Sequence, residues 1–156
     1  MSEAQQQPMF SIEKIYVKDL SLEVPGGPQT FMQPEQPQLE VQLTQQSQRV
    51  NDVLFEVTLV VSVAAKKGDK TLFLVEVSQA GVFQIRNVPE ADLGPVLGMV
   101  CPNVLFPYAR ETVSDVITRA GFPSVLLAPV NFEALYQQRA AESAAKPGGP
   151  SIEIAH

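Results

Sequence analysis

Two stretches of the chain alternate apolar and polar residues with a period of two, and this pattern constrains the fold more than any other feature. They cover residues 53–63 and 73–85, and their apolar positions are rich in the β-branched and aromatic residues that strands favour. Successive side chains of a strand point to opposite faces of a sheet, so each stretch predicts a strand with one buried face. The predicted core positions are Val53, Phe55, Val57, Leu59, Val61 and Val63 in the first stretch and Phe73, Val75, Val77, Phe83 and Ile85 in the second.

Two further strands are expected at 10–24 and 39–43, which brings the predicted sheet to four strands. Residues 66–70 read KKGDK and predict a short hairpin between the third and fourth strands. Residues 25–37 contain four prolines and two glycines and are too long for a tight hairpin. This segment therefore predicts a crossing connection, as in a Greek key.

The second half of the chain, 89–144, is expected to be helical but interrupted. Apolar residues at helical spacing predict a helix over 104–120 that ends at Gly121, and Asn131 is expected to cap a last helix. Strands followed by helices predict an α+β fold: a four-stranded antiparallel, Greek-key-like sheet with helices packed on one face. The start of the helical half is expected to be broken by three prolines: Pro89, Pro95 and Pro102.

The chain of 156 residues suits a single domain with a sizeable core. The Gln-rich residues 1–9 are expected to be a disordered lead, and residues 145–156, with their prolines and glycines, are expected to be a flexible tail. The folded domain is therefore expected to cover 10–144.

The net charge is −6, with 17 acidic and 11 basic residues. Binding to nucleic acid or to an anionic membrane surface requires a basic face, so both classes of partner are disfavoured and a basic partner is favoured. Cys101 is the single cysteine and cannot form an internal disulfide, which fits a reducing compartment. The N-terminal residues lack the pattern of a signal peptide, and no apolar run reaches the roughly 18 residues of a membrane span. A cytoplasmic protein without membrane insertion is expected.

The alternation also predicts which residues occupy the face of the sheet that the helices leave open. On the first strand Leu20, Leu22 and Val24 are expected to point inward, and on the fourth strand Leu74 is expected to point outward. The outward positions collect five carboxylates: Asp19, Glu23, Glu40, Glu56 and Glu76. Such a face is either simply solvated or a docking surface for a basic partner, and the residues alone leave both interpretations open.

The first strand contains one irregularity, because Ile15 and Val17 are out of phase with Leu20 and Leu22. A β-bulge would reset the phase of the strand. Alternatively, both faces of this stretch are buried, one of them against another subunit. The sequence does not separate the two explanations.

Four ordered motifs give the chain a family resemblance. CPNVLFPYARE at 101–111, followed by FP and then LAPVNFEALY at 127–136, resembles the SecB family of bacterial export chaperones, as do IYVKDLSLEVP at 15–25 and FLVEVSQAGVF at 73–83. The resemblance covers most of residues 10–142. It implies an ATP-independent holdase, assembled as a homotetramer from two dimers, that keeps preproteins unfolded and passes them to the SecA motor. It also implies that SecA binds the acidic sheet face, at Asp19, Glu23, Leu74 and Glu76.

A holdase needs exposed apolar surface for its unfolded clients, and aromatic side chains at the seam between sheet and helices are the candidates. We expect client binding to involve Tyr16, Phe83 and Tyr136. We favour the two tyrosines because a phenol hydroxyl can remain in contact with water while the ring contacts an apolar client. Ordinary core packing is the competing interpretation for any single aromatic residue. The full set of candidates is Tyr16, Phe31, Phe83, Phe106, Phe132 and Tyr136.

Other functions have less support in the residues. An enzyme or small-ligand-binding protein with a pocket under the helices would need converging polar groups, and the helical half offers few besides Arg110 and Glu111. Cys101 has no histidine base near it in the sequence, since the single histidine is His156. We therefore expect Cys101 to be a small, buried apolar residue. No metal-binding loop, nucleotide motif or cofactor motif is present. A chaperone of the same fold that serves a toxin–antitoxin system remains an alternative.

Overall fold

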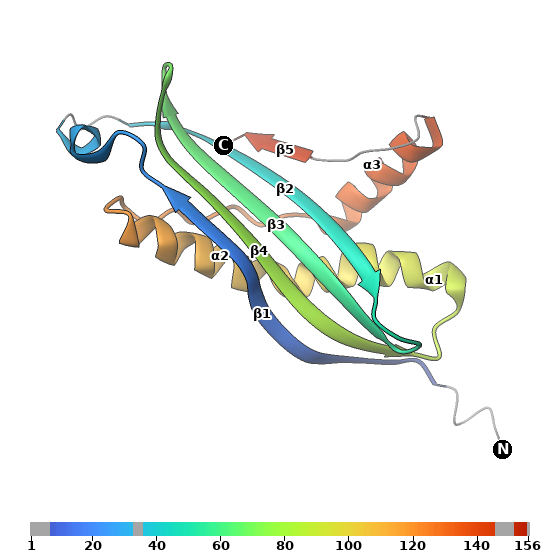
Figure 1. Ribbon diagram of the computed structural model, residues 1–156. Coiled ribbons are helices and arrows are strands. Elements are labelled where there is room, and N and C mark those ends of the chain that lie inside the picture. The colour runs from blue at the N-terminus through green and yellow to red at the C-terminus, as the bar shows by residue number, and fades with distance from the viewer. Residues whose placement is uncertain (1–6, 33–35, 146–151, 156) are drawn as a thin grey trace.

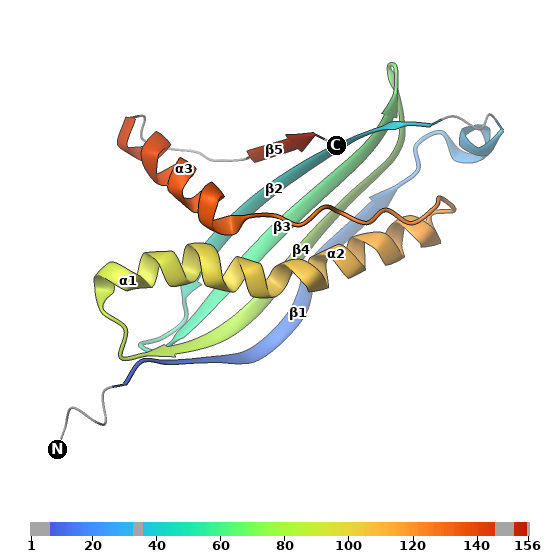
Figure 2. The same ribbon diagram turned by 180° about the vertical axis from the view of Figure 1, so that it is seen from behind.

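The computed structural model describes residues 7–32, 36–145 and 152–155 and consists of an antiparallel sheet with helices on one of its faces (Figures 1 and 2). The strands are β1 (Met9–Glu23), β2 (Gln38–Arg49), β3 (Leu54–Lys67), β4 (Lys70–Arg86) and β5 (Ile152–Ala155). The helical elements are the 3-10 turn η2 (Gly27–Phe31), α1 (Glu90–Pro95), the π-helical turn η3 (Val96–Val100), α2 (Cys101–Arg119) and α3 (Phe132–Ala145). Among the described residues, no helix has the length and apolar character needed to cross a membrane.

The strand order β1-β4-β3-β2-β5 confirms the predicted α+β fold with an antiparallel sheet. Strands β2, β3 and β4 follow one another as a meander, and β1 lies beside β4, which is the Greek-key arrangement. The connection from β1 to β2 crosses from one side of β4 and β3 to the other, as expected for residues 25–37, and it contains the 3-10 turn η2. Gly68 in the hairpin between β3 and β4 has φ +57, which explains why glycine occupies that turn.

The end segments differ in part from the expected lead and tail. Strand β1 begins at Met9, and α3 continues to Ala145. Residues 152–155, which were expected to belong to a flexible tail, form β5 on the edge of β2. The remaining residues of the expected lead and tail, 1–6, 146–151 and 156, lie outside the described part of the chain.

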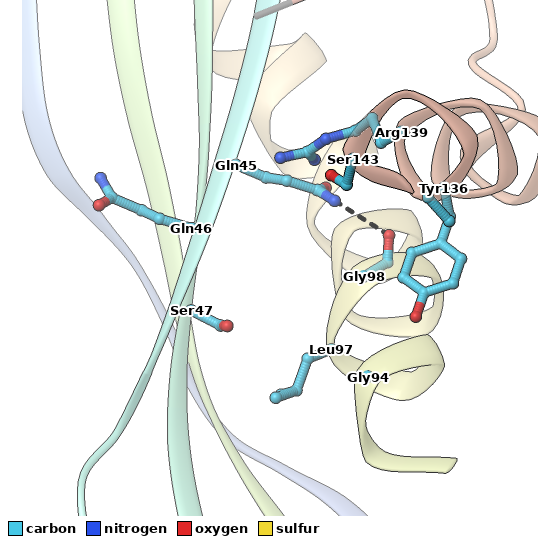
Figure 3. A pocket seen from close by; sticks show the side chains of 10 residues that line it. Gln45, Gln46, Ser47, Gly94, Leu97, Gly98, Tyr136, Arg139 and Ser143 are labelled. Carbon is cyan, nitrogen blue, oxygen red and sulfur yellow. Dashed lines mark hydrogen bonds between the residues drawn. The ribbon is translucent and has the colours of Figure 1, made fainter. Parts of the chain in front are cut away.

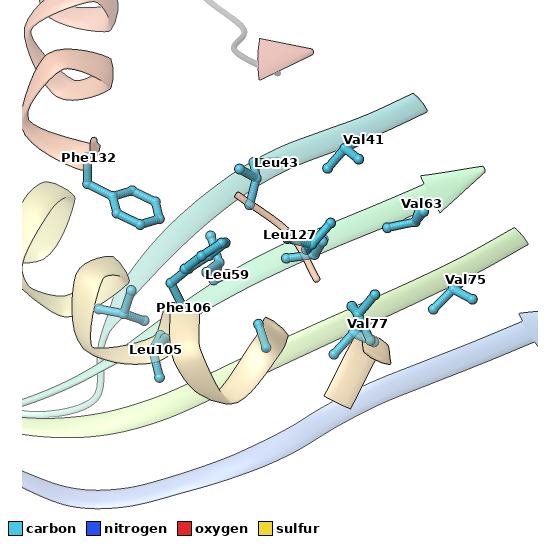
Figure 4. Packing of buried hydrophobic residues seen from close by; sticks show 14 of the residues in the cluster. Val41, Leu43, Leu59, Val63, Val75, Val77, Leu105, Phe106, Leu127 and Phe132 are labelled. Carbon is cyan, nitrogen blue, oxygen red and sulfur yellow. The ribbon is translucent and has the colours of Figure 1, made fainter. Parts of the chain in front are cut away.

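The core lies between the sheet and α2, where the predicted alternation is confirmed (Figure 4). Phe55 and Val61 of β3 and Phe73 and Val77 of β4 are buried on the helix-covered face, together with every second residue between them. The helix approaches β4 closely at Gly81, where an added Cβ would lie 3.0 Å from Leu105 Cδ2. Glycine at this position therefore lets α2 sit against the sheet.

A β-bulge in β1 explains the irregular phase of that strand. Val17 pairs with Gln79 and Asp19 pairs with Ser78, so Lys18 is an extra residue in the ladder. The extra residue resets the alternation, as the first of the two explanations proposed. Leu20 consequently pairs with Val77, a core residue, and lies on the helix-covered face as expected.

The prediction that prolines break the first part of the helical half is wrong. The chain is helical from Glu90 to Arg119, because the π-helical turn η3 widens the helix between Pro95 and Pro102. Pro102 has no N–H to donate to the carbonyl of Gly98, four residues earlier. Gln45 of β2 supplies the missing donor, with its Nε2 at 3.0 Å from that carbonyl oxygen. The sheet therefore satisfies a helix carbonyl that proline leaves without its usual partner.

The two remaining helix boundaries agree with the sequence. Gly121, just after α2, has φ +95, the left-handed region that commonly ends a helix. Asn131 caps α3, because its side-chain Oδ1 accepts a hydrogen bond of 3.0 Å from the N–H of Ala134.

Candidate functional site

The outer face of the sheet, opposite the helices, carries the predicted acidic residues on two adjacent strands. Glu23 pairs with Leu74, and Ser21 pairs with Glu76, so β1 and β4 present these side chains side by side. Asp19 lies one pair further along the same face, opposite Ser78. We call Asp19, Glu23, Leu74 and Glu76 the acidic patch. Part of it lines a shallow hollow of about 270 Å³ that also includes Glu40.

The other two carboxylates of this face are already compensated. Glu40 pairs with Lys66, with 3.4 Å between the carboxylate oxygen and Nζ. Glu56 pairs with Lys18 at 2.8 Å and also accepts a hydrogen bond from the hydroxyl of Tyr16. Within the described part of the chain, no lysine or arginine pairs with an acidic-patch carboxylate. The patch therefore holds the negative charge of this face that remains available to a basic partner.

Glu56 sits in a small polar network beside the patch. Hydrogen bonds from Lys18 and then from Tyr16 lower the pKa of the Glu56 carboxyl below its usual range. The same hydrogen bond, with burial and the nearby negative charge, raises the pKa of Tyr16 to about 12. Lys18 is the bulge residue, so this network fastens the bulge of β1 to β3.

Leu74 is the apolar member of the acidic patch. Its side chain is 38% exposed, although β4 is an interior strand of the sheet. Beside it, the Glu76 carboxylate accepts a hydrogen bond of 3.0 Å from the hydroxyl of Ser62 on β3. An exposed leucine beside the carboxylates of Glu23 and Glu76 matches the composition of a protein-docking site with an apolar contact and a charged surround.

The expected placement of Tyr16 at the seam between sheet and helices is wrong. Tyr16 pairs with Ala80 on the outer face, where it bonds Glu56, whereas Tyr136 lies on α3 on the helix side. Tyr16 has the same parity as Leu20 and Leu22, and the bulge at Lys18 turns it to the opposite face. The two tyrosines therefore do not line one groove of a single chain.

The other candidate aromatics divide between core and surface. Phe83, Phe106 and Phe132 are buried and belong to the core, so the expectation that Phe83 lines an open client groove is not supported by its position. Phe31 is exposed and packs on Phe122, with ring centroids 5.2 Å apart. Burial thus favours the competing core-packing interpretation for three of the six candidates.

Tyr136 lines an open pocket of about 370 Å³ between β2, the α1–η3 segment and α3 (Figure 3). Its ring lies against Gly94 and Gly98: a Cβ on Gly98 would be 2.5 Å from Tyr136 Cδ1, and one on Gly94 would be 2.9 Å from the phenol oxygen. Gln45, on the opposite wall, reaches Gly98 through the hydrogen bond described above. We call this the α3 pocket.

The sequence interpretation missed the α3 pocket. The sequence contains one signal for it, which is the pair of glycines four residues apart, at 94 and 98. Glycines at this spacing lie on one side of a helix and admit a close neighbour. Which aromatic side chain fills that space depends on the course of the chain after α2, which local sequence patterns do not give.

The free edge of β1 is a second apolar surface. Val17 is 45% exposed and Leu20 is 46% exposed, although both lie on the helix-covered face. Ile15, which was grouped with Val17 as a contact for another subunit, is instead half-buried against the core. The apolar residues with large exposed side chains along this strand are Met9, Phe10, Ile12, Val17, Leu20 and Leu22.

Among the described residues, potential catalytic groups do not converge at the acidic patch or in the α3 pocket. Cys101 is fully buried, and burial raises the pKa of its thiol to about 12, so it behaves as a small core residue. Among the residues described by the structure, no three His, Cys, Asp or Glu side chains gather as they would around a metal ion. The surfaces that the structure offers for binding are the acidic sheet face, the open pocket beside the helices and the apolar edge of β1.

Comparison with known proteins identifies the family. The family model "Preprotein translocase subunit SecB" matches residues 3–143. The protein-export protein SecB of Chromobacterium violaceum is 63% identical over 145 residues, which are 92% of this chain and 97% of that protein. The SecB of Nitrosospira multiformis is 56% identical over 155 residues, 98% of each chain. The chain belongs to the SecB family of protein-export chaperones, so the predicted family and the prediction that it is not an enzyme are confirmed.

A solved structure shares the fold. The SecB-like chaperone Rv1957 of Mycobacterium tuberculosis, solved in complex with a ChAD peptide from the antitoxin HigA1 (Rv1956), has a TM-score of 0.62. The likeness covers 78% of this chain and 87% of that chain, at 15% sequence identity. Identity at this level shows the fold alone.

Proposed function

We propose that the protein is an ATP-independent holdase of the cytoplasm that binds unfolded preproteins and delivers them to the SecA motor. SecA docks on the acidic patch: Leu74 supplies an apolar contact, and the carboxylates attract a basic surface. This surface is the best-formed candidate in the described chain, because its four residues come together on adjacent strands.

The observation that carries the proposal is the position of two binding surfaces on opposite faces of one sheet. The acidic patch lies on the outer face, and the α3 pocket with Tyr136 lies on the helix side. A protein that holds a client and hands it to a motor must bind both at once. Surfaces separated by the thickness of the sheet allow this without overlap.

Clients bind on the helix side, with Tyr136 as an aromatic contact and the backbone of β2 nearby. Pairing through backbone groups does not depend on client sequence, and the pockets for side chains then set a weak preference. The related fold that holds an antitoxin peptide supports a peptide as the class of ligand. Tyr16, in contrast, does not line the client groove. Its hydroxyl donates a hydrogen bond to Glu56 and helps to hold the bulge of β1 against β3.

The protein assembles as a homotetramer of two dimers. The apolar side chains along the free edge of β1 would otherwise remain exposed to water, on an edge whose backbone groups are open to pairing. A second β1 strand, or a helix of another subunit, would cover them. The proposed contacts include Val17 and the exposed side of α2.

The test is a reconstitution with three components. The purified protein is mixed with a denatured preprotein without ATP, and then with SecA. The expected results are suppressed refolding of the preprotein and a complex that contains all three proteins. The proposal fails if the preprotein refolds as fast as it does without the chaperone, or if SecA binds the chaperone only when the client is absent.

A further inference from the structure

The outer edge of β2 is occupied by the chain's own C-terminal segment. Strand β5 pairs antiparallel with β2 over four residue pairs, from Leu43↔Ile152 to Glu40↔Ala155, and is the last strand on that side of the sheet (Figures 1 and 2). Edges of β-sheets are the places where extended polypeptides add to a fold, through backbone hydrogen bonds. The edge of β2 therefore accepts a strand, and the occupant in this structure is tethered to the same chain.

The register of this pairing suits an alternating segment. The tail reads Ile152-Glu153-Ile154-Ala155, and its two isoleucines pair with Leu43 and Val41. Leu43 and Val41 both belong to the buried core, on the helix side of the sheet. An extended segment with an apolar residue at every second position matches this edge, and such segments are common in unfolded proteins because strands are built from them.

The edge continues directly into the surface assigned to clients. Beyond Leu43, the same strand reaches Thr44 and Gln45, which line a narrow hollow with Leu135 and Arg139 of α3. Gln45 and Arg139 also line the α3 pocket. A strand longer than β5, lying in the same register and direction, would therefore extend past Leu43 toward Tyr136.

We infer that the C-terminal segment 152–155 is a tethered competitor for an extended client strand on the edge of β2. The client pairs with the edge between Glu40 and Leu43 and continues along β2 toward the α3 pocket, and β5 must leave before it does so. This inference rests on the proposed client binding and adds to it the strand edge used and the element displaced. The tail also covers the edge between clients, which protects an exposed sheet edge from pairing with other chains.

Because β5 is part of the same chain, even this short strand can compete with a client for the edge of β2. Four residue pairs would bind weakly in trans, but linkage through the same chain raises the effective concentration of the segment to about millimolar. A tail that covers the edge about 90% of the time weakens the apparent affinity for a client about tenfold, because only the open fraction binds. Releasing the tail should therefore tighten client binding by up to about this factor.

The test uses the full-length chain with the double substitution Ile152→Ser and Ile154→Ser, which keeps length and charge and removes the two apolar residues of the register. Ala155→Ser is the matched control, because it changes a residue of the same strand that pairs with Glu40. Hydrogen exchange is followed at the β2 amides between Glu40 and Leu43 that point away from β3. Client affinity is measured with reduced, carboxymethylated α-lactalbumin, which stays unfolded in buffer.

We expect the β2 edge amides to be protected in the parent and in Ala155→Ser, and to exchange faster in the double variant. The double variant should bind the unfolded probe about three- to tenfold more tightly. Unprotected edge amides in the parent would overturn the inference, as would protection that depends on protein concentration, which assigns the strand to another copy. Equal client affinity in all three proteins would overturn the competition. Failure of the parent to bind any unfolded probe would instead contradict the proposed holdase function, and the inference with it.

Discussion

Glu23 on β1 and Leu74 on β4 are directly paired across the antiparallel ladder, on the face of the sheet that the helices leave open. Side chains of directly opposed residues lie close together, so this pair joins a carboxylate to an apolar contact. Glu76, two residues along β4 from Leu74, lies on the same face and pairs with Ser21. The central claim is that this geometry docks SecA while the helix side of the same sheet holds the client.

The network of Tyr16, Lys18 and Glu56 predicts how stability depends on pH. Glu56 has a lowered pKa, so its contribution is present above the ordinary value of 4.5 and is lost as pH falls through the folded-state pKa. Tyr16 has a raised pKa, so its contribution is complete below pH 10.0 and is lost as pH rises toward about 12. Glu56→Gln should therefore lower the melting temperature at pH 7 and flatten its decline in acid. Thermal unfolding between pH 3 and pH 7 measures both effects.

Tyr16 can be followed directly by its phenolate absorbance. In the parent, one of the three tyrosines should ionise only near pH 12. Glu56→Gln removes the carboxylate that holds the proton, so this tyrosine should ionise at a lower pH. An unchanged titration curve would show that the bond between Tyr16 and Glu56 does not form in solution.

The packing of Tyr136 on Gly94 and Gly98 predicts which of two glycine substitutions destabilises the docking of α3 more. Gly98→Ala places a Cβ 2.5 Å from the ring, whereas Gly94→Ala meets the phenol oxygen at 2.9 Å, at the end of a side chain that can move. Gly98→Ala should destabilise the docking of α3 by about 1–3 kcal/mol, and Gly94→Ala by less. Hydrogen exchange of α3 amides gives the comparison.

Removing the ring should abolish the effect of the added methyl group. In the background of Tyr136→Ala, Gly98→Ala should therefore add little further exchange in α3. An equally large effect with and without the ring would place the cause in the helix and not in the contact.

Substitutions of two aromatic residues should affect client holding and folding stability differently. Phe83 is fully buried, so Phe83→Ala should cost about 3–5 kcal/mol of unfolding free energy. Tyr136 is only partly buried in an open pocket, so Tyr136→Ala should weaken client holding more than it lowers the melting temperature. Chemical denaturation and a refolding-block assay on both variants measure the difference. If Tyr136→Ala unfolds the protein outright, the residue is part of the core.

The exposed edge of β1 predicts the surface used in assembly. Val17→Lys combined with Leu20→Lys puts charge on an edge strand and should shift a tetramer to smaller species. Val50→Lys is a matched control, because Val50 is 56% exposed and lies in the loop between β2 and β3. Light scattering at micromolar concentration gives the mass of each variant. A parent that is a stable monomer would contradict the assembly itself.

The alternation along β3 and β4 was sufficient to predict the sheet and its two faces, because a period of two fixes which residues share a face. It also placed the acidic patch, whose residues lie on regular stretches of β1 and β4. It misplaced Tyr16, because the bulge residue Lys18 reverses the faces of residues 14–17, up to the next register shift between Ile12 and Lys14. The position of a bulge depends on pairing with β4, which the local sequence does not show.

The helical half was harder to predict for a different reason. Pro95 and Pro102 normally end helices, but a π-helical turn and a hydrogen bond from Gln45 compensate for the lost backbone bonding. The α3 pocket depends on the same long-range contact, since Gln45 and Tyr136 come from elements far apart in the chain. Tertiary contacts of this kind lie beyond what patterns within a segment can indicate.

The most direct test of the central claim is calorimetry with SecA on Leu74→Arg, with Val50→Arg as the control for placing arginine at an exposed apolar site. We expect Leu74→Arg to weaken SecA binding by at least about tenfold, because it removes the apolar contact of the docking site and places positive charge against a basic partner. Its melting temperature and its ability to block client refolding should stay close to those of the parent, while Val50→Arg should leave all three properties unchanged. Unaltered SecA binding by Leu74→Arg, or a parallel loss of SecA binding and client holding, would contradict the separation of the two surfaces.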